Sequence, residues 1–346
     1  MTACGRRITE SGFGRLVHRE DGGVVVGDDE DPVLGLLPGE AFLLSPGRAR
    51  QRGQQHIAGA RVLAHVGRSK VSSGQGSCGG ERYVERVNDI ESRIDTSRPH
   101  TARIWNYWTG GKDNYPVDRA AGDEIRELHP GIGAYAKADR LFLGRAVRHL
   151  AEREGITQFL DIGTGLPSAD NTHEVAQRVA PDARVVYVDN DPLVLAHAQA
   201  LLVGTPEGRT DYLDADLRDV DTILAAAAKT IDFSEPVALM LLGVVIFVED
   251  DEESYAIVRR LMDALAPGSH LVLSHTVTHP DMPDVDEAVA FWNEHGTPKL
   301  TQRTPAAVAR YFEGLELLEP GVVSCSAWRA ATPTPDVAMY AGVGRK

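Results

Sequence analysis

From about residue 95 onward, short apolar runs typical of strands alternate with segments in which apolar residues have helical spacing. Short apolar runs predict strands at residues 158–162, 184–189, 210–213, 237–244 and 270–276. Helical spacing of apolar residues between and after them predicts helices near 219–229, 252–266, 284–295 and 305–313. Strands separated by helices of this length form right-handed crossovers. We therefore expect an α/β fold with a mostly parallel sheet and helices on both faces.

Three further features complete the predicted sheet and its helices. A helix over residues 133–154 stops at Gly155, and its apolar face is marked by Tyr135, Ala138, Leu141, Phe142, Ala146 and Leu150. Another helix has Asp191 as its cap and Pro192 in its first turn. The strand-like stretches 315–324 and 336–344 have no helix between them. They predict an antiparallel addition at one edge of the sheet.

The first 80 residues differ in composition from the rest. They hold 16 of the 34 glycines, and 10 basic minus 8 acidic side chains give them a charge of +2. Their apolar islands are too short for a core, so we expect residues 1–90 to be a disordered extension. Residues 91–346 then form the folded domain, with an amino-terminal helical lid over 95–155. A second hypothesis is a misassigned start, because 30 Arg against 6 Lys suggest a GC-rich gene in which Val84 or Val87 would begin the protein.

Charge and cysteine content exclude several classes of protein. A net charge of −14 and a pI near 5.3 argue against duplex nucleic acid and against an anionic membrane as partners. Cys4, Cys78 and Cys325 lie too far apart for a disulfide framework or a metal site. The opening residues contain no apolar signal region, and the longest apolar run, 237–248, is 12 residues. We expect a cytoplasmic protein without a metal, and its oligomeric state stays open.

The segment FLDIGTGLPS, residues 159–168, is the most informative part of the sequence. It places an apolar strand directly before a turn in which Gly163 allows a tight bend and Gly165 lets a ligand approach the backbone. A full dinucleotide fingerprint would have a third glycine at position 168, where this chain has Ser168. Asp161 stands two residues before Gly163, and its carboxylate could receive an amino group.

Two more acidic residues follow the next two strands. Asp189 ends the strand of VVYVDNDP, 26 residues after Gly163, where an acid commonly binds both hydroxyls of a ribose. Asp216 follows the third strand and could accept a hydrogen bond from an adenine amino group. An amino group, a ribose diol and an adenine amine together describe S-adenosylmethionine (SAM), whose sulfonium cation suits an acidic site. We add the neighbours Thr164, Asn190 and Leu217 to the expected cofactor-binding set.

Several segments resemble one known family. HTARIWNYWTGGKDNYPVDRAAGDEI, the FLDIGTGLPS and VVYVDNDP region, LMDALAPGSHLVLSH and RTPAAVARYFEGLELLEPGVV are similar to the actinomycete S-adenosyl methyltransferase family, formerly a domain of unknown function. The resemblance covers about residues 94–346. It implies a Rossmann-like class I methyltransferase fold with seven strands, the last antiparallel, and SAM as cofactor. The family's cofactor positions correspond to Asp161, Gly163, Gly165, Asp189 and Asp216.

This chain departs from the family pattern at residues 245–247. A Leu-His type sequence is expected after the fourth strand, but the chain has Val245-Ile246-Phe247. If that histidine shapes the acceptor side in relatives, the departure points to a different substrate or to impaired activity.

The segment WTGGKDNYP, residues 108–116, has two interpretations. As a flexible lid, it would use Lys112 or Arg103 to pair with the methionine carboxylate and Tyr115 to cover the adenosine. As a structural loop, its aromatic neighbours Trp105, Tyr107 and Trp108 would pack against the sheet. We place Lys112 and Tyr115 in the expected cofactor set.

Methyl transfer requires positioning, and sometimes a general base. His275, His279 and Glu249 follow strands and are candidate bases, although the run 249–252 also fits the acidic start of a helix. No motif indicates a nucleic-acid substrate, so a small-molecule acceptor is expected. Two alternatives remain open: a SAM-binding regulator without catalysis, which the 245–247 departure favours, and a nicotinamide-dependent oxidoreductase, which Asp161 and Ser168 disfavour.

Overall fold

The computed structural model describes residues 16–18, 24–26, 94–201 and 204–346. Near the amino terminus, β1 (Leu16–His18) pairs antiparallel with β2 (Val24–Val26). The rest of the expected extension, including both alternative start positions, lies outside the described residues, so those expectations stay predictions. In the described part of the chain, no helix combines the length and apolar character needed to cross a membrane.

A mixed sheet forms the centre of the domain. Its order is β5-β4-β3-β6-β7-β10-β8, with β9 also paired to β10. The parallel strands are β3 (Gln158–Ile162), β4 (Arg184–Asp189), β5 (Arg209–Asp214), β6 (Ala238–Leu242) and β7 (His270–Thr276). The strand β10 (Met339–Arg345) runs antiparallel to β7. This arrangement confirms the predicted fold class and the antiparallel last strand.

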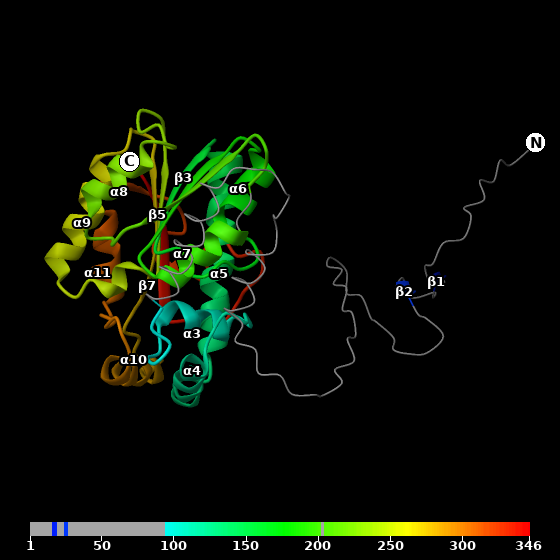
Figure 1. Ribbon diagram of the computed structural model, residues 1–346, viewed down its shortest axis with the longest axis vertical. Helices are drawn as coiled ribbons and strands as arrows, with labels where there is room; N and C mark the ends of the chain where they lie inside the picture. Colours follow the sequence, from blue (N-terminus) through cyan, green and yellow to red (C-terminus); the bar gives the residue numbers. More distant parts are fainter. Residues whose placement is uncertain (1–15, 19–23, 27–93, 202–203) are drawn as a thin grey trace, which may run out of the picture. The chain divides into compact units, whose positions relative to one another are not determined.

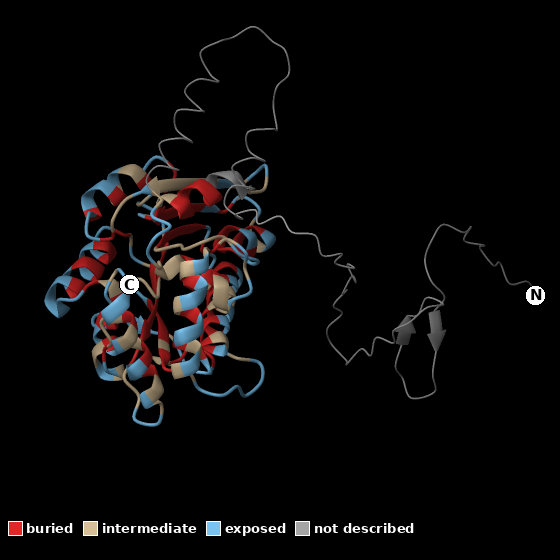
Figure 2. Ribbon diagram, turned by 60° about the horizontal axis from the view of Figure 1, so that its bottom comes forward, coloured by how far each residue is buried: buried red, intermediate tan, exposed pale blue. Residues whose placement is uncertain are grey.

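Helices cover both faces of this sheet (Figure 1). One face carries α5 (Ile132–Arg153), α6 (Thr172–Val179) and α7 (Pro192–Leu201), and the other carries α8 (Val220–Ala227), α9 (Asp251–Asp263) and α11 (Pro305–Ala309). Side chains of β3 alternate between the layers, so that Phe159 packs on the first face and Leu160 on the second. Figure 2 shows the strands buried between the two helical layers.

Three sequence expectations differ from the structure in detail. The stretch 315–324 forms two short strands, β8 (Glu316–Leu317) and β9 (Val323–Ser324), so the sheet has eight strands rather than seven. Pro320 and Gly321 separate them, because proline cannot donate a ladder hydrogen bond. The strand β6 is shorter than predicted, since the chain turns at Gly243 into the 3-10 helix η1 (Val245–Phe247). Leu141 is 53% exposed, and Leu143, about 200° further round α5, is buried instead.

Three helices gather at one end of the sheet: α3 (Thr101–Trp108), α4 (Pro116–Leu128) and α10 (Pro283–His295) (Figure 1). The helix α4 packs against both α3 and α10. Apolar side chains join the group to the main core, among them Ile104, Ile125, Ala288 and Trp292. Of the helices within the predicted lid, residues 95–155, α3 and α4 belong to this layer together with α10, whereas α5 covers a face of the sheet.

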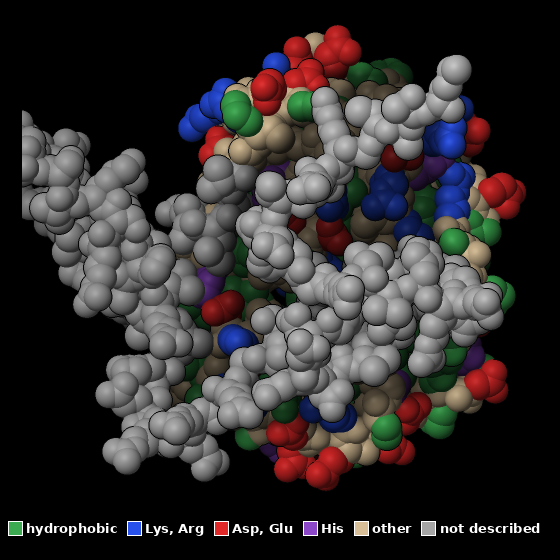
Figure 3. Space-filling view, turned by 90° about the vertical axis from the view of Figure 1, so that its right-hand side faces the viewer, with side chains coloured by type: hydrophobic (Ala, Val, Ile, Leu, Met, Phe, Trp, Pro, Cys, Tyr) green, Lys and Arg blue, Asp and Glu red, His purple; other side chains and the backbone are tan. Residues whose placement is uncertain are grey.

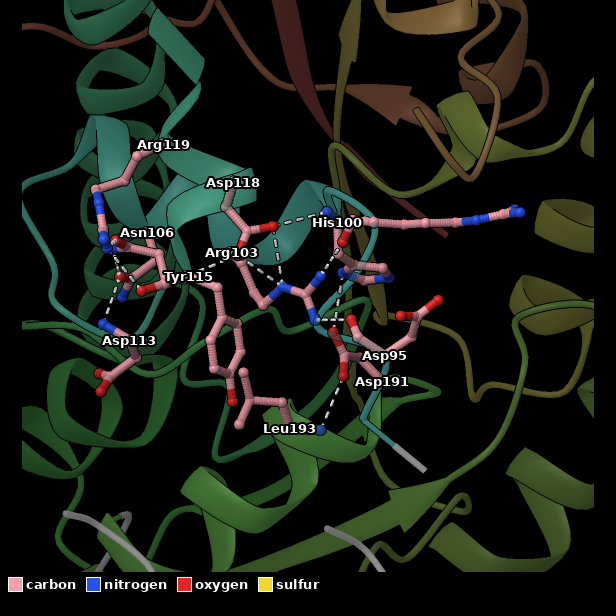
Figure 4. A network of polar contacts seen from close by, with 12 residues as sticks. Asp95, His100, Arg103, Asn106, Asp113, Tyr115, Asp118, Arg119, Asp191 and Leu193 are labelled. Carbon is pink, nitrogen blue, oxygen red and sulfur yellow. Dashed lines mark hydrogen bonds and ion pairs between the residues drawn. The ribbon is translucent and has the colours of Figure 1, made fainter. Parts of the chain in front are cut away.

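A buried ion pair holds the amino-terminal segment to this layer (Figure 4). The Asp118 carboxylate accepts hydrogen bonds from the backbone N–H groups of His100 (2.9 Å) and Tyr115 (2.8 Å), and lies 3.0 Å from the Arg103 Nε. Both charged side chains are buried. Arg103 also donates to the carbonyls of Asp95 and Arg98. Because all of these groups are satisfied, the network fixes where α3 and α4 begin.

The Asp118→Asn substitution should lower the free energy of unfolding by about 3–5 kcal/mol, because it leaves the buried Arg103 charge without a counter-ion. Asp123, on the same helix, forms an exposed pair with Arg126 at 3.1 Å. Asp123→Asn should therefore cost about 1 kcal/mol or less. Urea denaturation of both variants measures the difference, and equal losses would show that the Asp118–Arg103 pair does not anchor the layer.

Candidate functional site

A cavity of about 480 Å³ lies at the carboxyl ends of the parallel strands. Its walls come from the ends of β3 to β7, from α3, α5 and α10, and from residues near 298–300. Ligands of open α/β sheets bind at this edge, where loops follow each strand. All of the expected cofactor residues except Lys112 and Tyr115 line this cavity: Asp161, Gly163, Thr164, Gly165, Asp189, Asn190, Asp216 and Leu217.

The turn after β3 depends on its glycines. Gly163 and Gly165 have φ values of +77° and +67°, a region that side chains rarely adopt. A Cβ atom on Gly163 would also fall 2.3 Å from the Val244 side chain. The Gly163 N–H donates to the Val188 carbonyl at 2.8 Å, which holds the turn against β4. The turn therefore exposes bare backbone to the cavity.

Asp161 is a buried carboxylate at the end of β3. It accepts a hydrogen bond from the Thr172 hydroxyl at 2.6 Å. Burial nevertheless raises the pKa of Asp161 to about 6, because a charge in low-dielectric surroundings is costly. A cationic ligand group beside Asp161 would offset that cost.

Asp189 and Asp216 are held by neighbouring groups. Asp189 accepts from the backbone N–H groups of Gly165 and Asp191, both at 2.9 Å, and burial raises its pKa. Asp216 accepts from the Asn190 side-chain amide at 3.2 Å and from the Arg218 backbone N–H at 2.9 Å. Carboxylate oxygens have further lone pairs, so both can accept from a ligand as well.

The first helix after the glycine turn does not present a phosphate site. The amino terminus of α6 is closed by a capping box in which Asn171 and Glu174 pair with each other's backbone N–H groups. A dinucleotide pyrophosphate binds open N–H groups at such a helix end. The site thus lacks the feature that a nicotinamide dinucleotide would use.

Sequence reasoning missed two cavity residues, Asp139 and Arg140 on α5. The Asp139 Oδ1 and Arg140 Nε atoms are buried without a hydrogen-bond partner among the described residues. Burial raises the pKa of Asp139 to about 6. One signal was present in the sequence, since Asp139 lies four residues after Tyr135 and three before Phe142, on the apolar face of the predicted helix.

The lid residues are placed differently from the expectation. Lys112 and Tyr115 are not among the described residues that line the cavity. Tyr115 caps α4, and its ring lies 5.3 Å from the Arg103 guanidinium. Arg103 is committed to Asp118 and to two carbonyls. Trp105 and Trp108 pack against the core, as the structural-loop interpretation expects, and they also line the cavity.

The candidate bases occupy unequal positions. His275 is buried, and its Nδ1 lies 2.7 Å from the Thr276 carbonyl and its Nε2 2.8 Å from Arg303. Burial, together with the Arg303 charge, lowers the pKa of His275 to about 4. Both ring nitrogens of His275 contact other protein groups, and His275 does not line the cavity, so it is poorly placed to act as a general base. Glu249 is exposed at the cavity, and His279 does not line it.

The segment 245–247, where the chain departs from the family pattern, supplies apolar side chains to the cavity wall. Ile246 and Phe247 line the cavity, whereas Val245 is buried in the core. The Phe247 carbonyl accepts from Arg218 at 2.8 Å, which links η1 to the Asp216 loop. An apolar surface therefore stands where a histidine was expected from the family.

Acidic groups outnumber Lys and Arg around the cavity. The acidic side chains are Asp139, Asp161, Asp189, Asp216 and Glu249, and the basic ones are Arg140, Arg218 and Lys299. Such a site favours a ligand with net positive charge over a polyanion.

On the face shown in Figure 3, acidic and basic side chains are interspersed outside the grey atoms. No group of three or more His, Cys, Asp or Glu that could hold a metal ion occurs among the residues that the structure describes.

The chain is similar to several known proteins. A family model described as S-adenosyl methyltransferase matches residues 88–346. A DUF574 family protein from Streptomyces avermitilis MA-4680 is 44% identical, with a TM-score of 0.70 over 73% of this chain and 100% of that chain. A protein named as a methyltransferase from Thermobifida fusca YX is 41% identical, with a TM-score of 0.68 over 73% and 96%. Carboxy-S-adenosyl-L-methionine synthase from Chromohalobacter salexigens is 32% identical over 48% of this chain, which spans 59% of that enzyme.

The Asp161→Asn substitution should stabilise the ligand-free protein at neutral pH. The pKa of Asp161 is raised to about 6, so its contribution to stability is complete below about pH 4 and is lost as the pH rises through about 6. The asparagine of the variant does not ionise, so it does not lose stability over this pH range. Its gain in unfolding free energy should therefore grow between about pH 4 and pH 7, to at most about 3 kcal/mol.

Urea denaturation at several pH values measures this gain, with Asp182→Asn at an exposed site as the control. If the gain in unfolding free energy did not change with pH, it would contradict a raised pKa of Asp161 in the folded protein.

Proposed function

The chain belongs to the S-adenosyl methyltransferase family, and we propose that its described domain transfers the SAM methyl group to a small-molecule acceptor held in the same cavity. The observation that carries the proposal is the meeting of Asp161, Asp189 and Asp216 from adjacent strands around one acidic cavity. Carboxy-S-adenosyl-L-methionine synthase also handles an S-adenosyl compound by its name, which supports the cofactor but not the acceptor.

We assign the two ends of the cofactor to different residues. Asp189 would bind the ribose hydroxyls and Asp216 the adenine amino group, with Asn190 and Leu217 beside the base. Asp161 and Asp139 would receive the α-ammonium group, since both are buried and lack a full counter-charge. Arg140 would pair with the carboxylate through its free Nε. This set uses two unpartnered polar atoms of residues that line the cavity, the Asp139 Oδ1 and the Arg140 Nε, so the residues present fit the cofactor.

The remaining task of this chain is positioning. The sulfonium is a good leaving group, so holding the acceptor in line and excluding water supply most of the catalysis. Residues of α3, α4 and α10 line the cavity together with the carboxyl ends of the strands. A cytoplasmic location is part of the proposal and rests on the scattered cysteines.

Two alternatives are less well supported. A nicotinamide-dependent oxidoreductase would need a place for pyrophosphate, and the capped α6 and the acidic walls disfavour one. A regulator that only binds the cofactor was favoured by the 245–247 departure. Ile246 and Phe247, however, line the cavity beside α10 rather than fill it, which leaves space for an acceptor.

Calorimetric titration with S-adenosylhomocysteine should show binding, and Asp189→Asn should weaken it about 10- to 100-fold, because charge-assisted hydrogen bonds to the ribose are lost. Asp221→Asn, at an exposed residue paired with Arg260, is the control and should bind as the wild type does. Binding of NADH without binding of S-adenosylhomocysteine would overturn the proposal in favour of an oxidoreductase.

The affinity for S-adenosylhomocysteine should fall as the pH decreases from about 7 to about 5. Asp161 and Asp139 have pKa values raised to about 6, so acid protonates them and removes the charge that attracts the ammonium group. Asp161→Asn should bind more weakly at neutral pH and show a shallower pH dependence. Calorimetry across this range measures both effects, and a constant wild-type affinity would argue against an ammonium site at these carboxylates.

A further inference from the structure

His129 lines the cavity and forms a histidine–carboxylate pair with Asp284, which is not among the lining residues. His129 follows α4 and precedes Pro130, which ends the helix. Its Nδ1 lies 2.5 Å from the Asp284 Oδ2, in the first turn of α10. Its Nε2 is buried and has no hydrogen-bond partner among the described residues. The imidazole lines the cavity, so this pair joins two elements of the helical layer at the site itself.

The surrounding wall is apolar and aromatic. Tyr135 meets the His129 ring edge-on, with centroids 6.1 Å apart at an interplanar angle of 88°. The indoles of Trp105, Trp108 and Trp292 also line the cavity. Aromatic rings favour flat apolar partners through stacked and edge-to-face contacts. The aromatic residues of this wall are not among the residues assigned to the cofactor.

We propose that this region is the acceptor site, that it takes a flat aromatic compound bearing a hydroxyl group, and that His129 is the general base of the methyl transfer. The inference rests on the proposed function, and it adds the class of acceptor and a catalytic residue. Asp284 is a positioning residue, because it holds the Nδ1 proton and leaves Nε2 as the acceptor of a proton.

The proposed step is balanced in atoms and electrons. His129 Nε2 takes the proton of the acceptor hydroxyl, and the oxygen lone pair forms a bond to the methyl carbon. The bond between that carbon and the sulfonium sulfur breaks, and its electron pair stays on sulfur. The products are a methyl ether, S-adenosylhomocysteine and a protonated His129, which Asp284 stabilises until the proton leaves to water.

Other candidate bases fit less well. Both nitrogens of His275 are already engaged, by Arg303 and by the Thr276 carbonyl. Glu249 is exposed and belongs to the acidic start of α9. Asp139 shares the buried region of Asp161 and is used there for the ammonium group. A histidine that is oriented by a carboxylate and keeps one ring nitrogen free is well suited to general base catalysis.

Two matched probes test the base directly: 2-naphthol, which must lose its proton for transfer, and 2-naphthalenethiol, which is already ionised at mildly alkaline pH. Methyl-labelled SAM and the full chain are incubated with each. His129→Gln should reduce transfer to 2-naphthol about 100-fold or more. Transfer to the thiol and the affinity for S-adenosylhomocysteine should change by no more than about threefold. His295→Gln, at an exposed site outside the cavity, is the control.

Several outcomes would overturn the inference. Equal losses with both probes would make His129 a structural link between α4 and α10. Unchanged transfer to 2-naphthol would exclude it as the base. A wild-type protein that binds S-adenosylhomocysteine but methylates neither probe would exclude a flat aromatic acceptor. Failure to bind S-adenosylhomocysteine at all would instead count against the proposed function.

Asp284 is tested by separating turnover from binding. Asp284→Asn should lower kcat for 2-naphthol by about tenfold or more and leave KM nearly unchanged, because the ring loses its orientation but the pocket keeps its shape. Asp284→Glu should restore part of the rate. A rise in KM with constant kcat would show that Asp284 only shapes the pocket.

Discussion

Parallel strand register is the constraint on which the site depends. Because β3, β4 and β5 run in the same direction, residues at or just after their carboxyl ends meet at one edge, and here they include the carboxylates of Asp161, Asp189 and Asp216. Burial raises the pKa of Asp161 and Asp189, so the folded protein carries acids in surroundings that disfavour their charge. In the proposed site, a cationic cofactor would relieve this cost. The burial that weakens the free protein would then contribute to the affinity for the cofactor.

The helical layer is tied to this edge through one chain of polar contacts (Figure 4). Asp118 holds the His100 backbone, and the His100 ring lies 2.9 Å from Asp191. Burial alone would raise the pKa of Asp191, but the contact with His100 keeps it below the usual value. The Asp191 N–H in turn donates to Asp189. The placement of the helical layer and the placement of Asp189 are therefore linked through these contacts.

Much of the fold and of the cofactor side was predictable from sequence, because both depend on local patterns. Strand periodicity gave the bounds of β3, β4 and β7, and the spacing from Gly163 to Asp189 reflects one strand–helix–strand unit. The contact between His129 and Asp284 was not predictable in this way. His129 and Asp284 are 155 residues apart in sequence and meet only because α4 packs on α10. His275 was misleading, since a strand-end position does not reveal that Arg303 occupies its free nitrogen.

A crystal structure of the full chain with S-adenosylhomocysteine bound tests the central claim most directly. The account predicts adenine beside Asp216, ribose hydroxyls on Asp189 and the α-ammonium group at Asp161. A ligand bound elsewhere, or bound in this cavity with its amino acid end away from Asp161, would contradict it.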